Sequence, residues 1–464
     1  MSESKERLHA TWIHSDQFIP RRFARPIQSF MRIEAASGIV MLVAAVIAVL
    51  WANASFGESY FHFLETEFKL EFGPFHLEEH LGHLVNDGLM AIFFFVVGLE
   101  IKRELVLGEL RDRKAAMMPV MAALGGMVFP AAIYAALNFG DPAALRGWGV
   151  PMATDIAFSL GVLSLLGKRV PSAAKIFLLA LAIVDDLGGI LVIAVFYTEE
   201  LHFAYLVAGL AGLALVWAAS RAGVRHHAFY LPAAFAIWYF FLESGVHATL
   251  AGVALGFLTP AHPMYSVGEF DRKARQVLDT YPATADTPVE REHADHEGLL
   301  LADISREAVA PLIRNEHRLA MWSSFFVIPI FALANAGVRF EGSITDALLS
   351  RPALGVLLGL VVGKTVGITL FSWAAVKSGL GKLPTATNWR QMVGVASIAG
   401  IGFTVALFIT ALAYTDATLA DEAKVGIFAG SILSAIIGVV ILSTGKKAGS
   451  KAAAPAEDPV SATA

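Results

Sequence analysis

The sequence predicts an all-α polytopic membrane protein with about twelve transmembrane helices, two of them broken, and a small external β-hairpin. Hydrophobic residues make up 56% of the chain, charged residues make up 16%, and the mean hydropathy is +0.62. Soluble domains average about 45–50% apolar and about 25% charged residues. Long apolar segments also recur along the chain, and two of them are interrupted by Pro or Gly, a pattern typical of transporters.

A transmembrane helix needs about 20 predominantly apolar residues. Segments of this length, or close to it, recur from the first third of the chain to its end. The predicted spans are 34–52, 82–101, 116–138, 147–166, 173–197, 203–219, 229–242, 245–259, 320–337, 354–376, 391–414 and 424–443.

A weak internal repeat relates the fifth and twelfth segments. Ala174-Lys175 opens the fifth segment and Ala423-Lys424 opens the twelfth, and Ser434 then takes the place of Asp185. The two segments would have opposite orientations in the membrane. Inverted repeats of this kind place the substrate site at the interface between them.

Lys and Arg residues are concentrated in the loops that lie on the same side as both termini. Cytoplasmic loops carry such an excess, so both termini are expected to be cytoplasmic. The first 30 residues are polar and basic and do not resemble a cleavable signal peptide. The expected organisation is a cytoplasmic N-terminal arm at 1–33, spans 1–8 with the first repeat at 34–259, a cytoplasmic acidic insert at 260–316, spans 9–12 with the second repeat at 317–445, and a disordered cytoplasmic tail at 446–464.

Two segments are expected outside the bilayer. Residues 66–80 alternate in polarity around Gly73-Pro74, which predicts the external β-hairpin. The insert at 260–316 is acidic and polar and is predicted to be partly disordered. Its His293 and His296, three residues apart, would suit a metal ion, but a solvated loop is the favoured interpretation. The chain contains no cysteine, so it has neither disulfides nor thiolate metal sites.

The most informative residues are two adjacent aspartates, Asp185 and Asp186, within the apolar stretch 176–196. One carboxylate at the centre of a transmembrane helix costs about 2.5–3.5 kcal/mol on insertion scales. The default interpretation is an ion or proton site that faces a polar cavity. The alternative is that one Asp caps a helix break at Gly188-Gly189 while the other pairs with a buried base.

The fourth and eleventh spans carry the predicted breaks. Pro151 removes a backbone donor in the fourth span, and Asp155 follows it after Thr154. Broken backbone in a membrane is tolerated where it lines a cavity, and a carboxylate there stabilises an exposed helix N-terminus. The alternative is an ordinary cap at the membrane surface. In the eleventh span the pair Gly400-x-Gly402 permits a second break.

Lys364 lies near the middle of the tenth span. A buried ammonium needs an opposite charge, and the available partners are Asp155, Asp185 and Asp186. The alternative is that Lys364 snorkels to the surface, although it lies far from either end of the span. Three carboxylates and one Lys on broken spans predict a site for a hard cation such as Na⁺, with protons competing for the same oxygens. One Asp of the pair is expected to face the cavity and the other to face Lys364.

These motifs resemble those of the NhaA family of Na⁺/H⁺ antiporters. The resemblance covers roughly residues 30–445 apart from the insert. The stretches that carry it are Ala153-Thr154-Asp155-Ile156-Ala157-Phe158, Ala182-Ile183-Val184-Asp185-Asp186-Leu187-Gly188, Ser244-Gly245-Val246-His247-Ala248-Thr249-Leu250-Ala251-Gly252, Gly363-Lys364, Gly98-Leu99-Glu100-Ile101-Lys102-Arg103-Glu104-Leu105 and Phe331-Ala332-Leu333-Ala334-Asn335-Ala336-Gly337.

The resemblance implies twelve spans, with broken spans four and eleven crossing each other. It implies electrogenic exchange of cytoplasmic Na⁺ or Li⁺ for external protons, two protons for each Na⁺, in pH and sodium homeostasis. Asp186 would contact the cation together with Asp185, Asp185 would pair with Lys364, Asp155 would offset the helix N-termini, and Thr154 would add polar contacts. No cofactor and no enzymatic activity are implied.

The resemblance also bears on regulation, partners and location. It implies a bacterial inner-membrane protein, and the hairpin at 66–80 resembles a dimer contact, so a homodimer is expected. No nucleic-acid partner is expected. In the family's ninth span a second His and a Pro follow the Glu-His pair, and here Ala320 and Met321 replace them, so the pH set-point need not carry over. The pH-sensing candidates are Glu100, Arg103, Glu104, His247, Glu316 and His317, of which His247 would equally suit a packed helix interface.

Three other functions are alternatives for a membrane protein with an Asp pair. An intramembrane aspartyl protease needs two facing carboxylates from separate helices, and the chain has no Gly-x-Gly-Asp element. A passive cation channel is disfavoured by a deep Lys and by the absence of a carbonyl-filter repeat. A proton-coupled symporter of a small organic solute is the main alternative, and it would line the cavity with groups that recognise an organic moiety.

Overall fold

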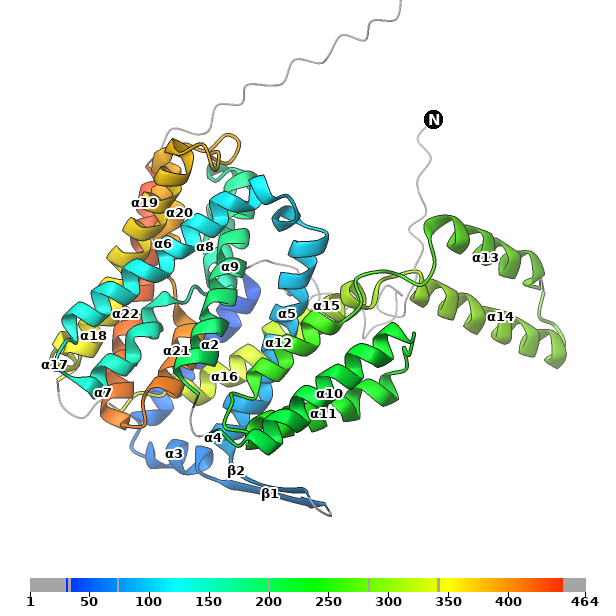
Figure 1. Ribbon diagram of the computed structural model, residues 1–464, viewed down its shortest axis with the longest axis horizontal. Helices are drawn as coiled ribbons and strands as arrows, with labels where there is room; N and C mark the ends of the chain where they lie inside the picture. Colours follow the sequence, from blue (N-terminus) through cyan, green and yellow to red (C-terminus); the bar gives the residue numbers. More distant parts are fainter. Residues whose placement is uncertain are drawn as a thin grey trace, which may run out of the picture.

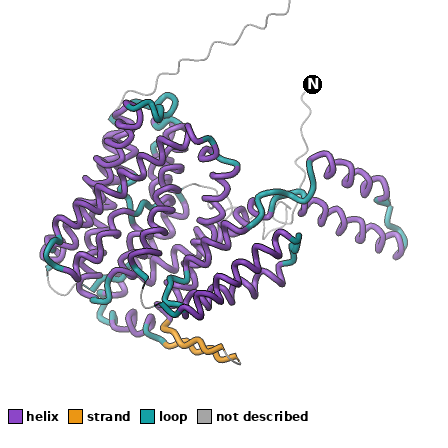
Figure 2. Tube along the Cα trace, in the orientation of Figure 1, coloured by secondary structure: helices purple, strands orange, loops and turns teal. Residues whose placement is uncertain are grey.

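The computed structural model describes residues 31, 35–72, 75–198, 201–282, 284–339 and 343–444. Figure 1 shows a bundle of long helices with a β-hairpin at one end and a pair of helices projecting from its side. Figure 2 shows that helices dominate the described residues. The predicted tail at 446–464 and the N-terminal arm at 1–33, except Met31, lie outside the described residues.

The first half of the chain contains helices up to the start of the insert. Their bounds are α2 Ala36–Ala52, α3 Glu58–Leu64, α4 Leu81–Leu84, η3 Val85–Leu89, α5 Met90–Val106, η4 Glu109–Arg111, α6 Arg113–Leu137, α7 Pro142–Leu145, η5 Arg146–Met152, α8 Ile156–Leu165, η6 Gly167–Arg169, α9 Ser172–Phe196, α10 Phe203–Arg221, α11 His227–Glu243 and α12 Thr249–Leu258.

The second half begins with the insert and returns to the bundle. Its helices are α13 Val267–Thr280, α14 Pro288–Glu307, α15 Pro311–Trp322, η7 Ser323–Val327, α16 Ile328–Asn335, α17 Ile344–Leu349, α18 Arg351–Leu358, η8 Gly359–Gly363, α19 Lys364–Lys377, α20 Trp389–Ile398, α21 Phe403–Ala413 and α22 Ala417–Ser443.

Many of these helices could cross a membrane. Among the described residues, seven continuous helical segments are long and apolar enough, and two bent helix pairs bring the number of candidates to nine. Three further apolar helices are shorter, between 10 and 17 residues. Large apolar side chains also face outwards: Leu50 on α2 is 66% exposed and Phe203 on α10 is 70% exposed. Soluble monomers rarely expose extended apolar surfaces, so these faces suit contact with lipid.

The two predicted breaks are present. The pair 142–152 and 156–165 is bent by 45°, and the pair 389–398 and 403–413 is bent by 47°. In the first pair, Pro151 lies in the 3₁₀-helix η5, and the backbone is extended at Ala153 and Asp155 before α8 begins. In the second pair, α20 ends at Ile398 and α21 begins after Gly402. Pro and Gly therefore interrupt these helices where the sequence predicts.

The predicted β-hairpin is also present. Strands β1 Glu67–Phe72 and β2 Phe75–His80 pair antiparallel, with Lys69 opposite Glu78. Lys69 forms ion pairs with Glu78 and Glu67, and hydrogen bonds to these two carboxylates raise the pKa of Lys69. Figure 2 shows the two strands extending away from the helical bundle.

The insert differs from the expectation of partial disorder, because it contains the two helices α13 and α14. Each begins with a capping box, Ser266 with Glu269 and Thr287 with Glu290. These hydrogen bonds lower the pKa values of both Glu side chains. The backbone N–H of Met264 donates to the carbonyl oxygen of Glu307 at 2.9 Å, which closes the base of the insert. The two capping sequences were the available indication of helix starts in this polar segment.

The insert's two histidines lie on its second helix. His293 and His296 are part of α14, and His293 is exposed to solvent. No group of three or more His, Cys, Asp or Glu side chains that could hold a metal ion occurs among the described residues.

Close helix packing within the bundle depends on small residues. Helices α6 and α19 approach each other at Gly125 and Gly367. A Cβ atom on Gly367 would lie 2.1 Å from the carbonyl oxygen of Gly125, and a Cβ atom on Gly125 would lie 2.2 Å from that of Gly367. Small residues let helix backbones approach in membranes, where packing replaces the hydrophobic driving force.

Gly367→Val should therefore lower the melting temperature of the purified protein in detergent. The added side chain must push α6 and α19 apart, and such overpacking typically costs about 1–3 kcal/mol. The matched control is Gly268→Val in α13, because a Cβ atom on Gly268 meets no other atom within 4 Å. Equal melting temperatures for the two variants would contradict the close packing of α6 against α19.

Candidate functional site

The two helix breaks contact each other directly. The backbone N–H of Asp155, in the first break, donates to the carbonyl oxygen of Ile401 in the second break at 2.6 Å. The hydroxyl of Thr154 donates to the carbonyl oxygen of Ala399 at 2.8 Å. Backbone groups that each broken span leaves unpaired are therefore satisfied by the other span, which a lipid-facing break could not achieve.

Asp155 lies between the N-terminal ends of two half-helices. Its carboxylate accepts a hydrogen bond from the backbone N–H of Phe158 at 3.0 Å, as the N-cap of α8. It also accepts hydrogen bonds from the backbone N–H of Thr404 at 3.1 Å and from the Thr404 hydroxyl at 2.6 Å, at the start of α21. A negative charge here offsets the partial positive charge of both N-termini. Asp155 does cap α8, but it is only 2% exposed and also bonds to the second break, which favours the predicted role over an ordinary surface cap.

Lys364 is paired with Asp185. The Lys364 Nζ lies 2.5 Å from Oδ2 of Asp185, and both side chains are completely buried. The same ammonium donates to the Thr154 hydroxyl at 2.9 Å. The structure thus selects Asp185 among the three carboxylates that the sequence offered, and it excludes snorkelling. The π-helical turn η8 directly precedes Lys364, and such turns in α-helices frequently mark functional sites.

Asp186 has a different environment from its neighbour. It is 5% exposed, and no ion pair involving it occurs among the described residues. Its Oδ1 atom is buried and has no hydrogen-bond partner within the described chain, and the same holds for Oδ1 of Asp185. Buried polar atoms are almost always satisfied, so these two carboxylate oxygens on adjacent residues are positions at which a proton, a water molecule or a cation can bind.

The sequence did not predict two of the residues that complete this arrangement. Thr404 supplies both a backbone N–H and a hydroxyl to Asp155. Ser159, one turn after Asp155, donates its hydroxyl to the carbonyl oxygen of Ile398 at 3.1 Å. The position of Thr404 directly after the Gly-rich break was the available indication, because hydroxyl side chains favour helix N-termini.

Four of the six pH-sensing candidates gather between α5 and α15. Arg103 donates to Glu316 Oε1 at 2.7 Å and to Glu104 Oε1 at 2.9 Å. Glu100 lies one turn before these residues on α5. These side chains come from helices far apart in the sequence, so the structure assembles a charged cluster that the resemblance alone suggested.

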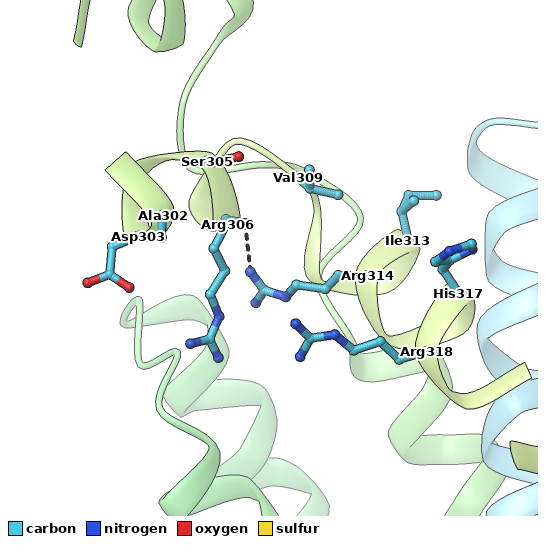
Figure 3. A pocket seen from close by; sticks show the side chains of 9 residues that line it. All are labelled: Ala302, Asp303, Ser305, Arg306, Val309, Ile313, Arg314, His317 and Arg318. Atoms are coloured by element: carbon cyan, nitrogen blue, oxygen red, sulfur yellow. Dashed lines mark hydrogen bonds between the residues drawn. The ribbon is translucent and has the colours of Figure 1, made fainter. Parts of the chain in front are cut away.

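The side chains of the other two pH-sensing candidates, His247 and His317, have different surroundings. His247 Nε2 donates to the carbonyl oxygen of Tyr197 at 2.8 Å, at the end of α9, so its surroundings are those of a packed helix interface. His317 lines a separate cavity of about 670 Å³. Figure 3 shows the guanidinium groups of Arg314 and Arg318 extending towards Arg306 in this cavity, with His317 directed away beside Ile313. His247 therefore lies outside the Arg103–Glu316 cluster, whereas His317 directly follows Glu316 on α15.

Buried charged residues at paired helix breaks define the class of this protein as a multi-pass membrane transporter. Ionisable groups inside a membrane bundle mark ion pathways, and broken helices mark the substrate site of many secondary transporters. The buried pair of Asp185 with Lys364 also removes one carboxylate from any aspartyl protease dyad.

Comparison with known proteins specifies the family. The sequence model described as Na⁺/H⁺ antiporter 1 matches residues 28–442. A Na⁺/H⁺ antiporter NhaA of Anaeromyxobacter sp. is 48% identical over 436 residues, which cover 93% of this chain and 94% of that relative. Antiporters of Oleidesulfovibrio alaskensis (45% identical; 90% of this chain and 93% of the relative) and Syntrophotalea carbinolica (44%; 90% and 96%) are also similar. The chain belongs to the NhaA family of Na⁺/H⁺ antiporters.

Membership of this family makes the protein a transporter and not an enzyme. Na⁺ and H⁺ are transported substrates of the family, which uses no cofactor. Membership of this family gives no support to the alternative function, a proton-coupled symporter of an organic solute.

Lys364→Ala should lower the melting temperature in detergent markedly. Removing one partner of a buried ion pair typically costs about 3–5 kcal/mol, because the remaining charge is left uncompensated. The control is Lys377→Ala at the exposed end of the same helix, where Nζ lies 4.6 Å from the centre of the Trp373 ring. An unchanged melting curve for Lys364→Ala would argue against the pair.

Proposed function

We propose that the protein exchanges cytoplasmic Na⁺, or Li⁺, for external protons at a site formed by Asp185 and Asp186. The observation that carries this proposal is the pair of buried, unsatisfied carboxylate oxygens on these adjacent residues. Carboxylate oxygens suit a hard cation, and the same oxygens bind protons when the cation is absent. Competition for one set of oxygens, combined with access from alternate sides, is sufficient for antiport.

The contacts around Lys364 suggest how two protons could balance one cation. Asp186 lacks a cationic partner among the described residues, whereas Asp185 is neutralised by Lys364. A cation that engages both carboxylates would displace one proton from Asp186. By withdrawing Asp185 from Lys364 it would also let the Lys364 ammonium release the second proton. Exchange of two protons for one Na⁺ moves one charge inwards, worth about 2.3 kcal/mol per 100 mV. A negative interior would therefore drive Na⁺ out, in support of pH and sodium homeostasis.

The proposed supporting residues are Asp155 and Thr154. The Asp155 carboxylate would hold the N-termini of α8 and α21 together through Phe158 and Thr404. Thr154 would link the Lys364 ammonium to the second break, since it accepts from Lys364 and donates to Ala399. Binding or release of a cation at Asp185 would therefore change the contacts of Lys364 and Thr154, and through them both helix breaks.

We further propose a topology of twelve spans with both termini cytoplasmic, in a bacterial inner membrane. Treating each bent pair as one span and including the shorter apolar helices gives this number. The proposed spans form an inverted repeat whose two broken helices cross, and 260–316 would be a cytoplasmic insert. The asymmetric distribution of Lys and Arg supports the orientation. The β-hairpin, which extends from the bundle, is the proposed contact of a homodimer.

Regulation by pH is proposed for the cluster at Arg103. Its guanidinium joins Glu104 on α5 to Glu316 on α15, and Glu100 lies one turn away. Protonation of Glu316 would weaken the ion pair between the two helices and alter their packing. His317 directly follows Glu316 on α15 and would act on it electrostatically, whereas His247 lies outside this cluster.

The exchange activity can be tested in everted membrane vesicles from a host without its own antiporters. We expect addition of Na⁺ or Li⁺ to collapse a ΔpH recorded with a fluorescent dye between pH 6.5 and 8.5. Asp186→Asn should abolish this response while the protein still inserts into the membrane, because an amide cannot exchange a proton for the cation. The control Asp303→Asn, on an exposed position of α14, should leave exchange unchanged.

Two outcomes would contradict the proposal. Na⁺-driven proton flux by Asp186→Asn at the wild-type rate would exclude Asp186 from the site. A wild-type protein that responds to no cation at any pH would exclude Na⁺/H⁺ exchange itself.

Replacing 265–306 by a short Gly-Ser linker should preserve exchange. The linker can join the two ends because Met264 and Glu307 are already hydrogen-bonded at the base of the insert. None of the contacts described for Asp185, Asp186 or Lys364 involves the removed residues. The same dye assay would report both the activity and its pH profile. Total loss of exchange in a correctly inserted variant would show that the insert is part of the transport machinery.

A further inference from the structure

Three buried tyrosine hydroxyls converge on the segment that precedes the first break. Tyr134 is in α6, Tyr197 directly follows α9, and Tyr414 directly follows α21. They are 0%, 3% and 8% exposed. All three contact α7 or η5, the half of the broken span that comes before Thr154. We call these residues the tyrosine clamp.

The hydroxyl of Tyr197 is inserted into a turn of η5. It donates to the carbonyl oxygen of Arg146 at 2.7 Å and accepts from the backbone N–H of Gly149 at 3.3 Å. In a regular 3₁₀-helix these two backbone groups, three residues apart, would bond to each other. The hydroxyl therefore ties η5 to the end of α9 by replacing a hydrogen bond within η5.

Tyr134 and Tyr414 share one acceptor. Each hydroxyl lies 3.0 Å from the carbonyl oxygen of Ala144, and the two hydroxyls also contact each other. Two hydroxyl hydrogens cannot serve three contacts at once, so either tyrosine alone can still donate to Ala144. The two side chains are therefore partly redundant.

The positions in η5 that face the tyrosine hydroxyls require glycine. A Cβ atom on Gly147 would lie 1.9 Å from the Tyr414 hydroxyl oxygen, and a Cβ atom on Gly149 would lie 2.8 Å from that of Tyr197. The sequence Gly147-Trp148-Gly149 thus presents bare backbone to the hydroxyls. Trp148 between them packs edge-on against Phe196, with ring centres 5.0 Å apart.

The tyrosine clamp joins α6 to three elements that carry residues described above, namely the first broken span, α9 and α21, but at one end of the bundle. Asp186 and Tyr197 are eleven residues apart on and after α9, or about 16 Å along a helix. Basic residues lie at the opposite ends: Arg113 begins α6, and Arg169 precedes α9. In the proposed topology the clamp therefore lies between the ion site and the external face of the membrane.

We propose that Tyr134, Tyr197 and Tyr414 are positioning residues that hold the outer half of the broken span against α6, α9 and α21 and so close the site to the external side. This proposal rests on the proposed exchange function. Opening the site outwards requires η5 to separate from at least one of these helices, and that separation breaks the hydroxyl hydrogen bonds. The clamp therefore sets the balance between inward-accessible and outward-accessible states.

Replacing tyrosine by phenylalanine removes only the hydroxyl. In Tyr197→Phe and in the double variant Tyr134→Phe/Tyr414→Phe, the outward-accessible state should gain population. The KM for Na⁺ added to everted vesicles should rise roughly three- to tenfold, as expected for the loss of one or two hydrogen bonds, with kcat largely retained. Each single change at 134 or 414 should have less than half the effect of the double variant, because the other hydroxyl still reaches Ala144.

A second readout reports on accessibility directly. The natural chain has no cysteine, so Val150→Cys in η5 introduces a single thiol at a position that is 0% exposed. In right-side-out cells, a membrane-impermeant maleimide should label this thiol several-fold faster when it is combined with Tyr197→Phe. A purely structural role for the tyrosines would not produce labelling from one side only.

Tyr60→Phe is the matched control. Tyr60 is 2% exposed and donates to the carbonyl oxygens of Leu333 and Ala334, at 2.9 and 2.7 Å, away from the clamp. It should change neither KM nor labelling. Equal changes in Tyr60→Phe, or unchanged KM and labelling in every clamp variant, would overturn the proposal.

Failure of the proposed function would look different from failure of the clamp. If the wild-type protein exchanged no Na⁺, the exchange function would fail, while the thiol labelling would still measure closure of η5. If Tyr197→Phe did not fold, the double variant would provide the same comparison through Ala144. Normal Na⁺ exchange with equal external labelling of all variants would refute the clamp alone.

Discussion

The structure depends on one buried ion pair, between Lys364 and Asp185. The Lys364 ammonium has no exposed surface, so its charge must be neutralised within the protein. The Asp185 carboxylate, from another helix, does this at 2.5 Å. The pair brings α19 to α9, and the second contact of Lys364, to Thr154, adds the first helix break. Asp186 lies beside the pair without a cationic partner of its own among the described residues, and the proposed exchange depends on this imbalance.

The two broken spans solve a problem that each would have alone. A break inside a membrane leaves backbone groups without partners, and lipid cannot supply them. Here Asp155 donates to Ile401 through its backbone and accepts from Thr404 through its carboxylate. One carboxylate thereby stabilises two helix N-termini. The same contacts hold the polar residues of the site near the ion pair, so the structural requirement and the chemical requirement are met by the same atoms.

The residues that we propose to regulate transport lie apart from the residues of the proposed ion site. The Arg103–Glu316 cluster joins α5 to α15, and the tyrosine clamp holds η5 at another end of the bundle. Both act between helices that also contribute to the site or pack against it. Small changes at either place can therefore alter helix packing without replacing a residue of the proposed ion site, as expected for a transporter whose substrate site is shared by two states.

The sequence by itself determined the class of protein, the two helix breaks, the β-hairpin and the short list of charged residues that must act together. These features are local, because a charge, a Pro or a Gly affects the apolar segment that contains it regardless of which other helices that segment packs against. The residue pattern left three possible partners for Lys364; the family resemblance implied Asp185, and the tertiary structure confirmed that pair. Only the tertiary structure decided that Thr404 completes the Asp155 contacts and that three tyrosines meet over η5. These contacts are between residues more than a hundred positions apart in the sequence, or between the ends of different helices. They depend on helix packing, which no local sequence pattern encodes. The two helices of the insert lie between these cases, since their capping boxes are local signals but both helices are polar overall and pack on no long apolar stretch of their own.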